Sequence, residues 1–265
     1  MPTSSRSVRR PFRTLLAGSL AALTIASAQP AGAIIHGVEV GANDPYAHAV
    51  VGVVPSYVHG LPGSCSGVLL TPRAVLTAAH CVTPDDRTGE LKGVSVVFDL
   101  KIGDANRVAV TKIVVHPDYK DDLGKFTPAD LAVVFLAQHD FPTTIEPLDS
   151  APTFKEGEQF VLLGYGRSEK RRHNSAGTLR KAAIAATGHA TDRVVELRPL
   201  SDAWPCSGDS GGPVLSKDLS GHYAIAGVMS AVLIGPVHEC LFEGAFMTPV
   251  HAYAGWIADT LAAGG

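Results

Sequence analysis

The sequence predicts an all-β protein, built as a β-sandwich or a β-barrel, and three observations support this fold class. After Ile34 the chain is a succession of short apolar, β-branched runs separated by turn residues. Its 27 glycines and 18 prolines suit many turns and short strands better than long helices. Helical spacing of apolar residues is clear only at the C-terminal end. The 265 residues suffice for one large all-β domain or two small ones.

Eight apolar runs are the clearest strand candidates. They cover residues 49–54, 67–70, 94–98, 107–115, 131–136, 159–163, 193–197 and 223–229. The segment 143–157 contains Pro147 and Pro152 and lacks a strand pattern, so it is the best candidate for a linker between two halves. No internal repeat is visible between those halves.

A single helix is predicted at the C-terminal end. Thr248 offers an N-cap, and Pro249 suits the first helical position. The apolar residues that recur at helical spacing are Val250, Tyr253, Ala254, Ile257 and Leu261. We expect this helix to pack on the second half of the chain, without a catalytic role.

Residues 1–33 are typical of an export signal. Four arginines form a basic head, an apolar stretch follows at 15–28, and small-residue cleavage patterns end at Ala28 and Ala33. The stretch is too short and too rich in small residues for a stable membrane anchor. We expect a secreted or periplasmic protein, with a signal at 1–33, or a signal at 1–28 and a propeptide at 29–33. Arg9-Arg10-Pro11-Phe12 also resembles a twin-arginine signal.

The net charge of the chain is negative and does not indicate a nucleic-acid-binding protein, which usually carries an excess of basic residues. The formal net charge is −3, and removing the four arginines of the signal makes the chain more negative still. The basic run Lys170-Arg171-Arg172 is then best explained as a solvated loop. We therefore expect no nucleic acid among the partners.

The four cysteines of an exported chain indicate two disulfides, and spacing alone leaves three connectivities open. Neither a C-x-x-C nor an H-E-x-x-H motif occurs, so a structural zinc site is not expected. Asp85, Asp86 and Glu90 could supply oxygen ligands for calcium, but acids in a loop are usually solvated, and no calcium site is assigned. We expect no metal and no cofactor.

The strongest chemical signal is Gly208-Asp209-Ser210-Gly211-Gly212-Pro213. A serine hydroxyl becomes a useful nucleophile only when a base takes its proton and the developing oxyanion is stabilised. Glycines beside Ser210 allow a tight turn, and the N–H groups of Gly208 and Ser210 can converge on one oxyanion. Taken alone, the segment could equally be a glycine-rich turn with an incidental serine.

Two further segments supply the partners that such a serine needs. Thr77-Ala78-Ala79-His80-Cys81 places a histidine after an apolar run, and Asp130-Leu131-Ala132-Val133 places a carboxylate before an apolar strand. Alone, His80 could be a surface or core histidine, and Asp130 a turn residue. With Ser210, in the order His, Asp, Ser, these segments resemble the chymotrypsin–trypsin family of serine proteases.

The resemblance extends over most of the chain after Ile34. The other matching elements are Ile34-Ile35-His36-Gly37, Cys65-Ser66-Gly67, His116-Pro117-Asp118-Tyr119, Gly164-Tyr165-Gly166 and the terminal helix with Trp256. It implies two perpendicular six-stranded Greek-key β-barrels, at 34–147 and 148–265, with a C-terminal α-helix. The catalytic group would lie in the cleft between the barrels.

The same resemblance implies a role for each residue of the catalytic group. His80 takes the proton of Ser210, Asp130 holds the imidazole tautomer, and the N–H groups of Gly208 and Ser210 form the oxyanion hole. One implied disulfide braces the His80 loop and another the walls of the substrate pocket: Cys65–Cys81 and Cys206–Cys240.

In this family a new N-terminal ammonium pairs with the aspartate before the nucleophile, which implies a pair between Ile34 and Asp209. No arginine or lysine stands directly before Ile34 for tryptic activation, whereas a small-residue cleavage pattern does. Our hypothesis is that signal removal itself exposes the active N-terminus. His36 stands where the family has glycine.

The substrate pocket departs from the tryptic pattern. Enzymes that cleave after Lys or Arg carry an aspartate six residues before the nucleophile, where this chain has Trp204. By resemblance, Ser230 contacts the catalytic aspartate and begins the substrate-binding strand. Val232 replaces a glycine and narrows the pocket, while Gly244 leaves the opposite wall open. We expect small or medium apolar side chains before the cleaved bond.

The expected protein is a monomeric serine endopeptidase, with proteins or peptides as substrates and protein inhibitors as further partners. Three rival interpretations stay open. A catalytically silent family member would act as a binding module, and a structural β-protein would carry the motif by chance. An esterase would use the same triad, although the G-x-S-x-G pattern here lacks its strand–turn–helix setting.

Overall fold

The computed structural model describes Met1 and residues 34–264 apart from internal gaps. These gaps are 60–62, 85–88, 121–126, 138–143, 148–153, 170–172, 218–221, 233–239 and 241–243. The predicted signal segment lies outside the described residues except for Met1, as do Asp85, Asp86 and Lys170-Arg171-Arg172. The described residues from Ile34 onward belong to one compact unit, Ala31–Gly265.

The first half of this unit forms a closed, antiparallel, six-stranded barrel. Its strands are β2 (Val50–Tyr57), β3 (Cys65–Thr71), β4 (Ala74–Thr77), β5 (Leu91–Val97), β6 (Arg107–Val115) and β7 (Ala132–Leu136). They close in the order β2-β3-β4-β7-β6-β5. β4 and β7 are buried along their whole length, which explains why their sequences are almost continuously apolar.

The second half forms another antiparallel barrel. Its strands are β8 (Gln159–Gly164), β9 (Arg180–Thr191), β10 (Val194–Pro199), β11 (Pro213–Lys217), β12 (Tyr223–Val232) and β13 (Ala245–Pro249). They follow the order β9-β10-β13-β12-β11-β8, and an additional pairing of β8 with β9 closes the ring. The short strand β1 (Val38–Glu39) pairs with the first residues of β9, so the N-terminal segment lies on the second barrel.

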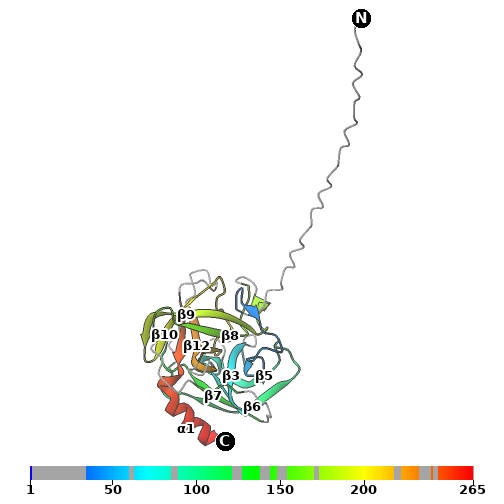
Figure 1. Cartoon of the computed structure of the whole chain (residues 1–265). Coiled ribbons are helices and arrows are strands. Elements are labelled where there is room, and N and C mark those ends of the chain that lie inside the picture. Colours follow the sequence, from blue (N-terminus) through cyan, green and yellow to red (C-terminus); the bar gives the residue numbers. More distant parts are fainter. Residues whose placement is uncertain are drawn as a thin grey trace. The chain divides into compact units, whose positions relative to one another are not determined.

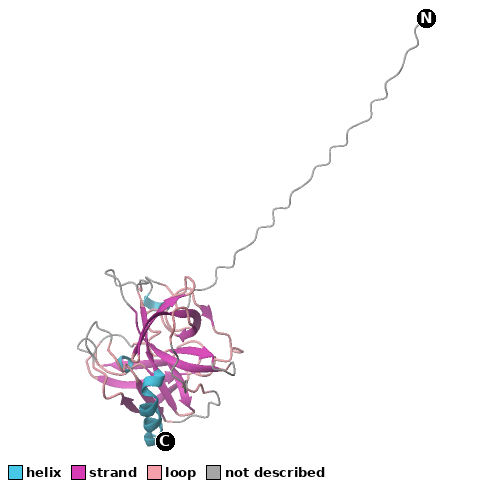
Figure 2. Cartoon of the chain, turned by 60° about the vertical axis from the view of Figure 1, so that its left-hand side comes forward, coloured by secondary structure: helices cyan, strands magenta, loops and turns pink. Residues whose placement is uncertain are grey.

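Both barrels use one strand order, in which the third strand neighbours the sixth and the fourth strand neighbours the first. The prediction of two six-stranded barrels is therefore confirmed, and the shared order is a repeat that the sequence does not reveal. In Figure 1, β3, β5 and β6 mark the first barrel, and β9, β10 and β12 the second. Figure 2 shows that strands dominate and that the long helix lies at the C-terminal end.

The C-terminal helix begins later than the sequence predicts. Thr248 and Pro249 end strand β13 because they pair with Val228 and Gly227 of β12, so they do not cap a helix. A 3-10 turn, η3 (Val250–Tyr253), follows without a side-chain cap, and α1 (Ala254–Gly264) begins after it. The ladder hydrogen bonds of the sheet outweigh the local helix-start signal.

The helix also packs differently from the prediction, which placed it on the second half. The end of α1 lies against strand β7 of the first barrel, where a Cβ on Gly264 would overlap the ring of Phe135. Lys112 of β6 donates through Nζ to the carbonyl of Ala263 at 3.2 Å. That prediction was wrong, because α1 runs from the end of the second barrel onto the first.

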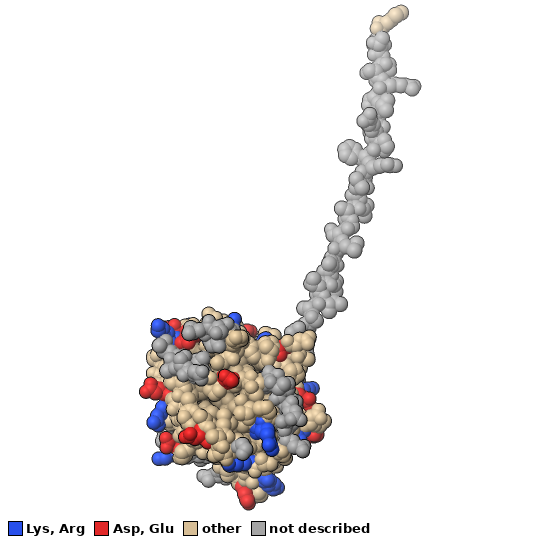
Figure 3. Space-filling view, turned by 60° about the horizontal axis from the view of Figure 1, so that its bottom comes forward, with Lys and Arg blue, Asp and Glu red and all other residues tan. Residues whose placement is uncertain are grey.

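None of the described helices is long and apolar enough to cross a membrane. On the face shown in Figure 3, acidic and basic side chains lie scattered among uncharged ones. No basic patch gathers on that face, in keeping with the charge balance of the sequence.

Candidate active site

Both disulfides implied by the resemblance are present. Cys65–Cys81 joins the start of β3 to the 3-10 turn η1 (Ala79–Cys81), which carries His80, and Cys206 is bonded to Cys240. The ligand atoms of Cys65, His80 and Cys81 form a possible metal cluster among the described residues. Because the two sulfurs are bonded to each other, they cannot bind a metal as thiolates.

His80 and Asp130 are joined by two hydrogen bonds. The ring atom Nδ1 of His80 lies 2.8 Å from Asp130 Oδ2, and the backbone N–H of His80 donates to Oδ1 at 3.0 Å. Ser230 adds a third bond, since its hydroxyl donates to Oδ2 at 2.6 Å. The carboxylate is therefore held in one orientation by partners from both barrels.

The protonation state of Asp130 follows from these contacts. Burial raises the pKa of the carboxyl, but the charge of His80 and the hydrogen bonds from His80 and Ser230 outweigh burial and hold the pKa below its ordinary value. An ionised carboxylate can only accept hydrogen bonds, so the proton of the neutral imidazole lies on Nδ1. Nε2 is then the acceptor nitrogen of His80, as a general base requires.

Ser210 lies among the same neighbours. Its Oγ is 3.5 Å from the carbonyl oxygen of Ser230, the residue whose hydroxyl binds Asp130. The sulfur of Cys81 lies 3.8 Å from His80 Nε2 and 3.6 Å from the carbonyl oxygen of Ser210. Two shared neighbours, Ser230 and Cys81, therefore bring Ser210, His80 and Asp130 to one place.

The loop before Ser210 depends on a glycine at position 208. Gly208 adopts φ of 101°, and a Cβ at this position would lie 2.8 Å from the Cα of Gly166, so a larger residue would not fit. Within the described part of the chain, the N–H groups of Gly208 and Ser210 donate to no other group. Both donors are thus available to an oxyanion.

Ser66 is a site residue that sequence reasoning missed. Its buried Oγ donates to the carbonyl of Gly208 at 2.9 Å and accepts from the N–H of Tyr165, also at 2.9 Å. Its own N–H donates to the carbonyl of Ser210 at 2.8 Å. Ser66 on β3 therefore fixes the Ser210 loop to the first barrel. A single serine in a strand gives no sequence signal for this role.

Asp209 is fully buried behind the loop. Its carboxylate accepts from the N–H groups of Gly166 and Cys206, each at 2.8 Å. Burial raises its pKa to about 7, although these two hydrogen bonds act in the opposite direction. A Cβ on Gly164 or Gly166 would lie 2.3 or 2.4 Å from the Asp209 side chain, which explains the glycines of the Gly-Tyr-Gly element.

The N-terminal segment enters the second barrel near this carboxylate loop. Ile34 is fully buried in the core of that barrel, and Ile35 forms a two-bond bridge with Trp204, each bond 2.9 Å long. In the uncut chain Ile34 carries an amide instead of an ammonium. The pair between Ile34 and Asp209 therefore remains a prediction about the cleaved protein.

The predicted pocket residues fall into two groups. Ser230 and Val232 lie at the end of β12, and Val232 pairs with Ala245, next to Gly244. Trp204 is only 3% exposed and packs with Ile35 and the Cys206–Cys240 disulfide, forming a small apolar cluster. Residues 233–239 and 241–243, which stand between Val232 and Gly244 in the sequence, lie outside the described residues.

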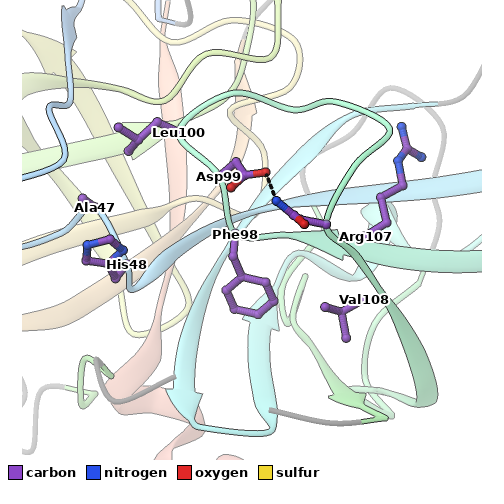
Figure 4. A pocket seen from close by; sticks show the side chains of 8 residues that line it. Ala47, His48, Phe98, Asp99, Leu100, Arg107 and Val108 are labelled. Atoms are coloured by element: carbon purple, nitrogen blue, oxygen red, sulfur yellow. Dashed lines mark hydrogen bonds between the residues drawn. The ribbon is translucent and has the colours of Figure 1, made fainter. Parts of the chain in front are cut away.

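A hollow of about 490 Å³ lies beside the first barrel, and none of the proposed catalytic residues lines it (Figure 4). Phe98 and Val108 contribute apolar surface, while the Asp99 carboxylate accepts from Asn106 Nδ2 at 3.1 Å. The carbonyl oxygen of Asp99 also faces the Tyr165 hydroxyl at 3.0 Å. Asp99, which lines the hollow, is thus hydrogen-bonded through its carbonyl to Tyr165 of the Gly-Tyr-Gly element.

Two barrels of equal topology, with a His–Asp–Ser group held between them, define the class of trypsin-like serine protease homologues. The family model named Trypsin matches residues 41–257, and the chain belongs to this family. A "Trypsin-like protease" of Streptomyces glaucescens is 31% identical over 235 residues, covering 81% of each chain.

Two animal relatives extend the comparison. "Chymotrypsin-like elastase family member 1" of Bos taurus is 28% identical over 224 residues, covering 75% of this chain and 79% of the relative. "Complement C1s-1 subcomponent" of Mus musculus is 25% identical over 224 residues, and this chain spans 32% of that longer protein.

Proposed function

We propose that this chain is a secreted serine endopeptidase with Ser210 as nucleophile, His80 as general base and Asp130 as orienting carboxylate. The observation that carries the proposal is a continuous set of contacts. His80 Nδ1 lies 2.8 Å from Asp130, Asp130 accepts from Ser230, and the Ser230 carbonyl faces Ser210 Oγ. Such an arrangement orients a base toward a serine hydroxyl.

The proposed reaction proceeds through an acyl-enzyme. Nε2 of His80 takes the Ser210 proton as Oγ attacks the carbonyl carbon of the peptide bond, and the N–H groups of Gly208 and Ser210 stabilise the oxyanion. The imidazolium, stabilised by Asp130, then protonates the leaving amine, and the C–N bond breaks. Water, deprotonated by His80, attacks the acyl ester, and Oγ leaves with the returned proton.

We propose small or medium apolar side chains before the cleaved bond. Trp204 occupies the position of the tryptic aspartate and is buried against the Cys206–Cys240 disulfide, so it offers no anion to a basic side chain. Val232 adds a branched side chain where the family has glycine. Cleavage of a diverse peptide mixture tests this, and cleavage mainly after Lys or Arg would contradict it.

Export and activation form one step in this proposal. Removal of residues 1–33 would free the ammonium of Ile34, which would pair with the buried carboxylate of Asp209. Such a pair would lower the pKa of Asp209 from about 7 and order the loop before Ser210. N-terminal sequencing of the secreted protein decides the point, since active enzyme beginning at Gln29 would refute the single step.

Covalent labelling tests the catalytic proposal against the silent binding module. An organophosphonate should label the processed protein stoichiometrically at Ser210, and the label should be lost in Ser210→Ala and His80→Ala. Ser216→Ala on β11, a partly exposed strand serine outside the site, should label like the wild type. Failure to label a correctly processed, folded protein would favour the binding module. Activity on casein against a short-chain ester separates peptidase from esterase.

A further inference from the structure

The segment that follows the proposed cleavage site is bound to the second barrel along its length. Ile35 bridges to Trp204, the N–H of Val40 donates to Leu179 at 3.1 Å, and β1 pairs with β9 between them. We call residues 34–40 the activation segment. Its attachment is already complete in the uncut chain, before any ammonium exists.

Arg180 of β9 makes the main side-chain contact to the activation segment. Its guanidinium donates through Nη1 to the carbonyl of Gly37 and through Nη2 to the carboxylate of Glu39. The Arg180 side chain is 7% exposed, whereas that of Glu39 is 49% exposed. A guanidinium this deeply buried is unfavourable unless paired, so the two contacts account for its position.

The bond from Arg180 to the Gly37 carbonyl lies at the turn of residues 34–37, whose backbone is sterically constrained. His36 adopts φ of 55°, a left-handed conformation that residues other than glycine seldom hold. A Cβ on Gly37 would lie 2.9 Å from the Cβ of Ile34, so the turn is also tightly closed. The imidazole of His36 faces Asp202 at 3.1 Å, but both side chains are well exposed, and such a pair holds little.

We propose that Arg180 is a positioning residue that locks the activation segment onto the second barrel and thereby sets the alkaline limit of activity. The inference rests on the proposed function, because it assumes that the Ile34 ammonium must insert beside Asp209. A left-handed residue persists only when its surroundings determine its conformation. The N–H of Gly37 closes the turn by donating to the carbonyl of Ile34 at 2.8 Å, and the bond from Arg180 to the carbonyl of Gly37 fastens that turn to β9.

The alkaline limit follows from linkage. A free α-amino group has a pKa of about 7.7–8.0, and insertion of its charged form raises that pKa with the logarithm of the insertion equilibrium constant. Activity is therefore present below the raised pKa and lost as the pH rises through it. A tenfold weaker insertion lowers the midpoint of this loss by about one pH unit.

Several charged groups surround the segment and must be separated in a test. They are Asp209 behind the loop, Asp202 at His36, Glu39 at Arg180, and the neighbouring pair of Lys181 with Asp44. Lys181 lies on the same strand as Arg180 but pairs with a carboxylate outside the activation segment. It provides a matched control.

The experiment compares the pH dependence of kcat/KM for mature enzyme beginning at Ile34. Arg180→Gln should lower the alkaline midpoint by about one pH unit, with activity near pH 7 largely kept, and Arg180→Lys should restore part of the shift. Lys181→Gln should leave the midpoint unchanged. Acylation of the Ile34 amine by a small reagent should be faster in Arg180→Gln, which gives a readout independent of turnover.

Two milder variants keep the proposal testable if Arg180→Gln does not fold. Glu39→Gln should lower the midpoint, and His36→Gly should raise it, because glycine relieves the left-handed turn. The proposed role of Arg180 would be overturned if the alkaline midpoints were equal in all folded variants. It would also be overturned if Lys181→Gln shifted the midpoint as much as Arg180→Gln does. Loss of labelling and activity in the wild type would instead overturn the proposed function.

Discussion

Replacing Ser230 with alanine isolates one hydrogen bond to the proposed catalytic carboxylate. Ser230 Oγ donates to Asp130 Oδ2 at 2.6 Å, and the Asp130 side chain is only 4% exposed, so water cannot readily replace the lost donor. The substitution leaves the Ser230 carbonyl, which faces Ser210 Oγ, in place. The change therefore acts on the carboxylate and not on the substrate-binding backbone.

The expected magnitude follows from the charge of the acceptor. A hydrogen bond to a charged group contributes about 1.5–3 kcal/mol, so the free energy of unfolding at pH 7 should fall by about that amount. The pKa of Asp130 should rise from its lowered value, because one of the hydrogen bonds that favour the ionised form is lost.

The sign of the pH dependence follows from the lowered pKa of Asp130. Its ionised form stabilises the folded protein above the ordinary pKa of an aspartate, and this stability is lost as the pH falls through the lowered folded-state pKa. In Ser230→Ala the folded-state pKa is higher. The variant should therefore gain less stability from Asp130 at neutral pH and lose that smaller contribution over a narrower, less acidic range.

Urea unfolding between about pH 3 and pH 7, in a Ser210→Ala background that prevents autolysis, measures the stability change. In the active enzyme, kcat/KM should fall about tenfold as the imidazolium loses part of its support. Ser216→Ala is the control, because its hydroxyl lies outside the site and donates to the carbonyl of Lys217, at 3.5 Å. A loss in Ser230→Ala no greater than in the control would refute the reasoning.

Three other perturbations test separate features. Tyr165→Phe should lower the free energy of unfolding by about 1 kcal/mol in urea, because it removes a buried hydroxyl that reaches the first barrel; unchanged stability would show that this bond adds nothing. Burial raises the pKa of Asp209 to about 7 in the uncut chain. The free energy of unfolding of the uncut chain, measured in a Ser210→Ala background, should therefore fall as the pH rises from about 4 to about 7. The chain beginning at Ile34 should lack most of this loss, and equal urea profiles for the two would contradict the ammonium pair. Val232→Gly should move cleavage of a peptide mixture toward larger apolar side chains, and an unaltered profile would remove Val232 from the pocket.

Local chemistry led to the choice of the proposed catalytic residues. Ser210 stands in a run of glycines, and His80 is adjacent to a cysteine whose disulfide partner could be assigned through the family resemblance. Asp130 precedes a strand whose apolar sequence is explained by complete burial. In each case the signal lies within a few residues of the chain, where sequence patterns are informative.

Features that depend on distant pairing could not be predicted. Thr248 and Pro249 carry a genuine helix-start signal, but pairing with β12 keeps them in a strand. The roles of Ser66 and Arg180 have no local signal, since each acts on a segment far away in the sequence; Ser66 appeared only as part of the matching element Cys65-Ser66-Gly67. Side-chain roles of this kind become visible only after the sheet brings the segments together.

The bonds between the barrels explain why the site needs both of them. Asp130 belongs to the first barrel but receives a bond from Ser230 of the second, while Ser66 of the first holds the carbonyl of Gly208 in the second. Like Ser230, Tyr165 belongs to the second half of the unit and donates to the first: its hydroxyl donates to the carbonyl of Asp99 at 3.0 Å. Reciprocal bonds of this kind fix the relative position of the proposed base, His80, and the proposed nucleophile, Ser210. A small shift between the barrels should therefore reduce turnover before it reduces the stability of either barrel, because reaction geometry tolerates less displacement than packing does.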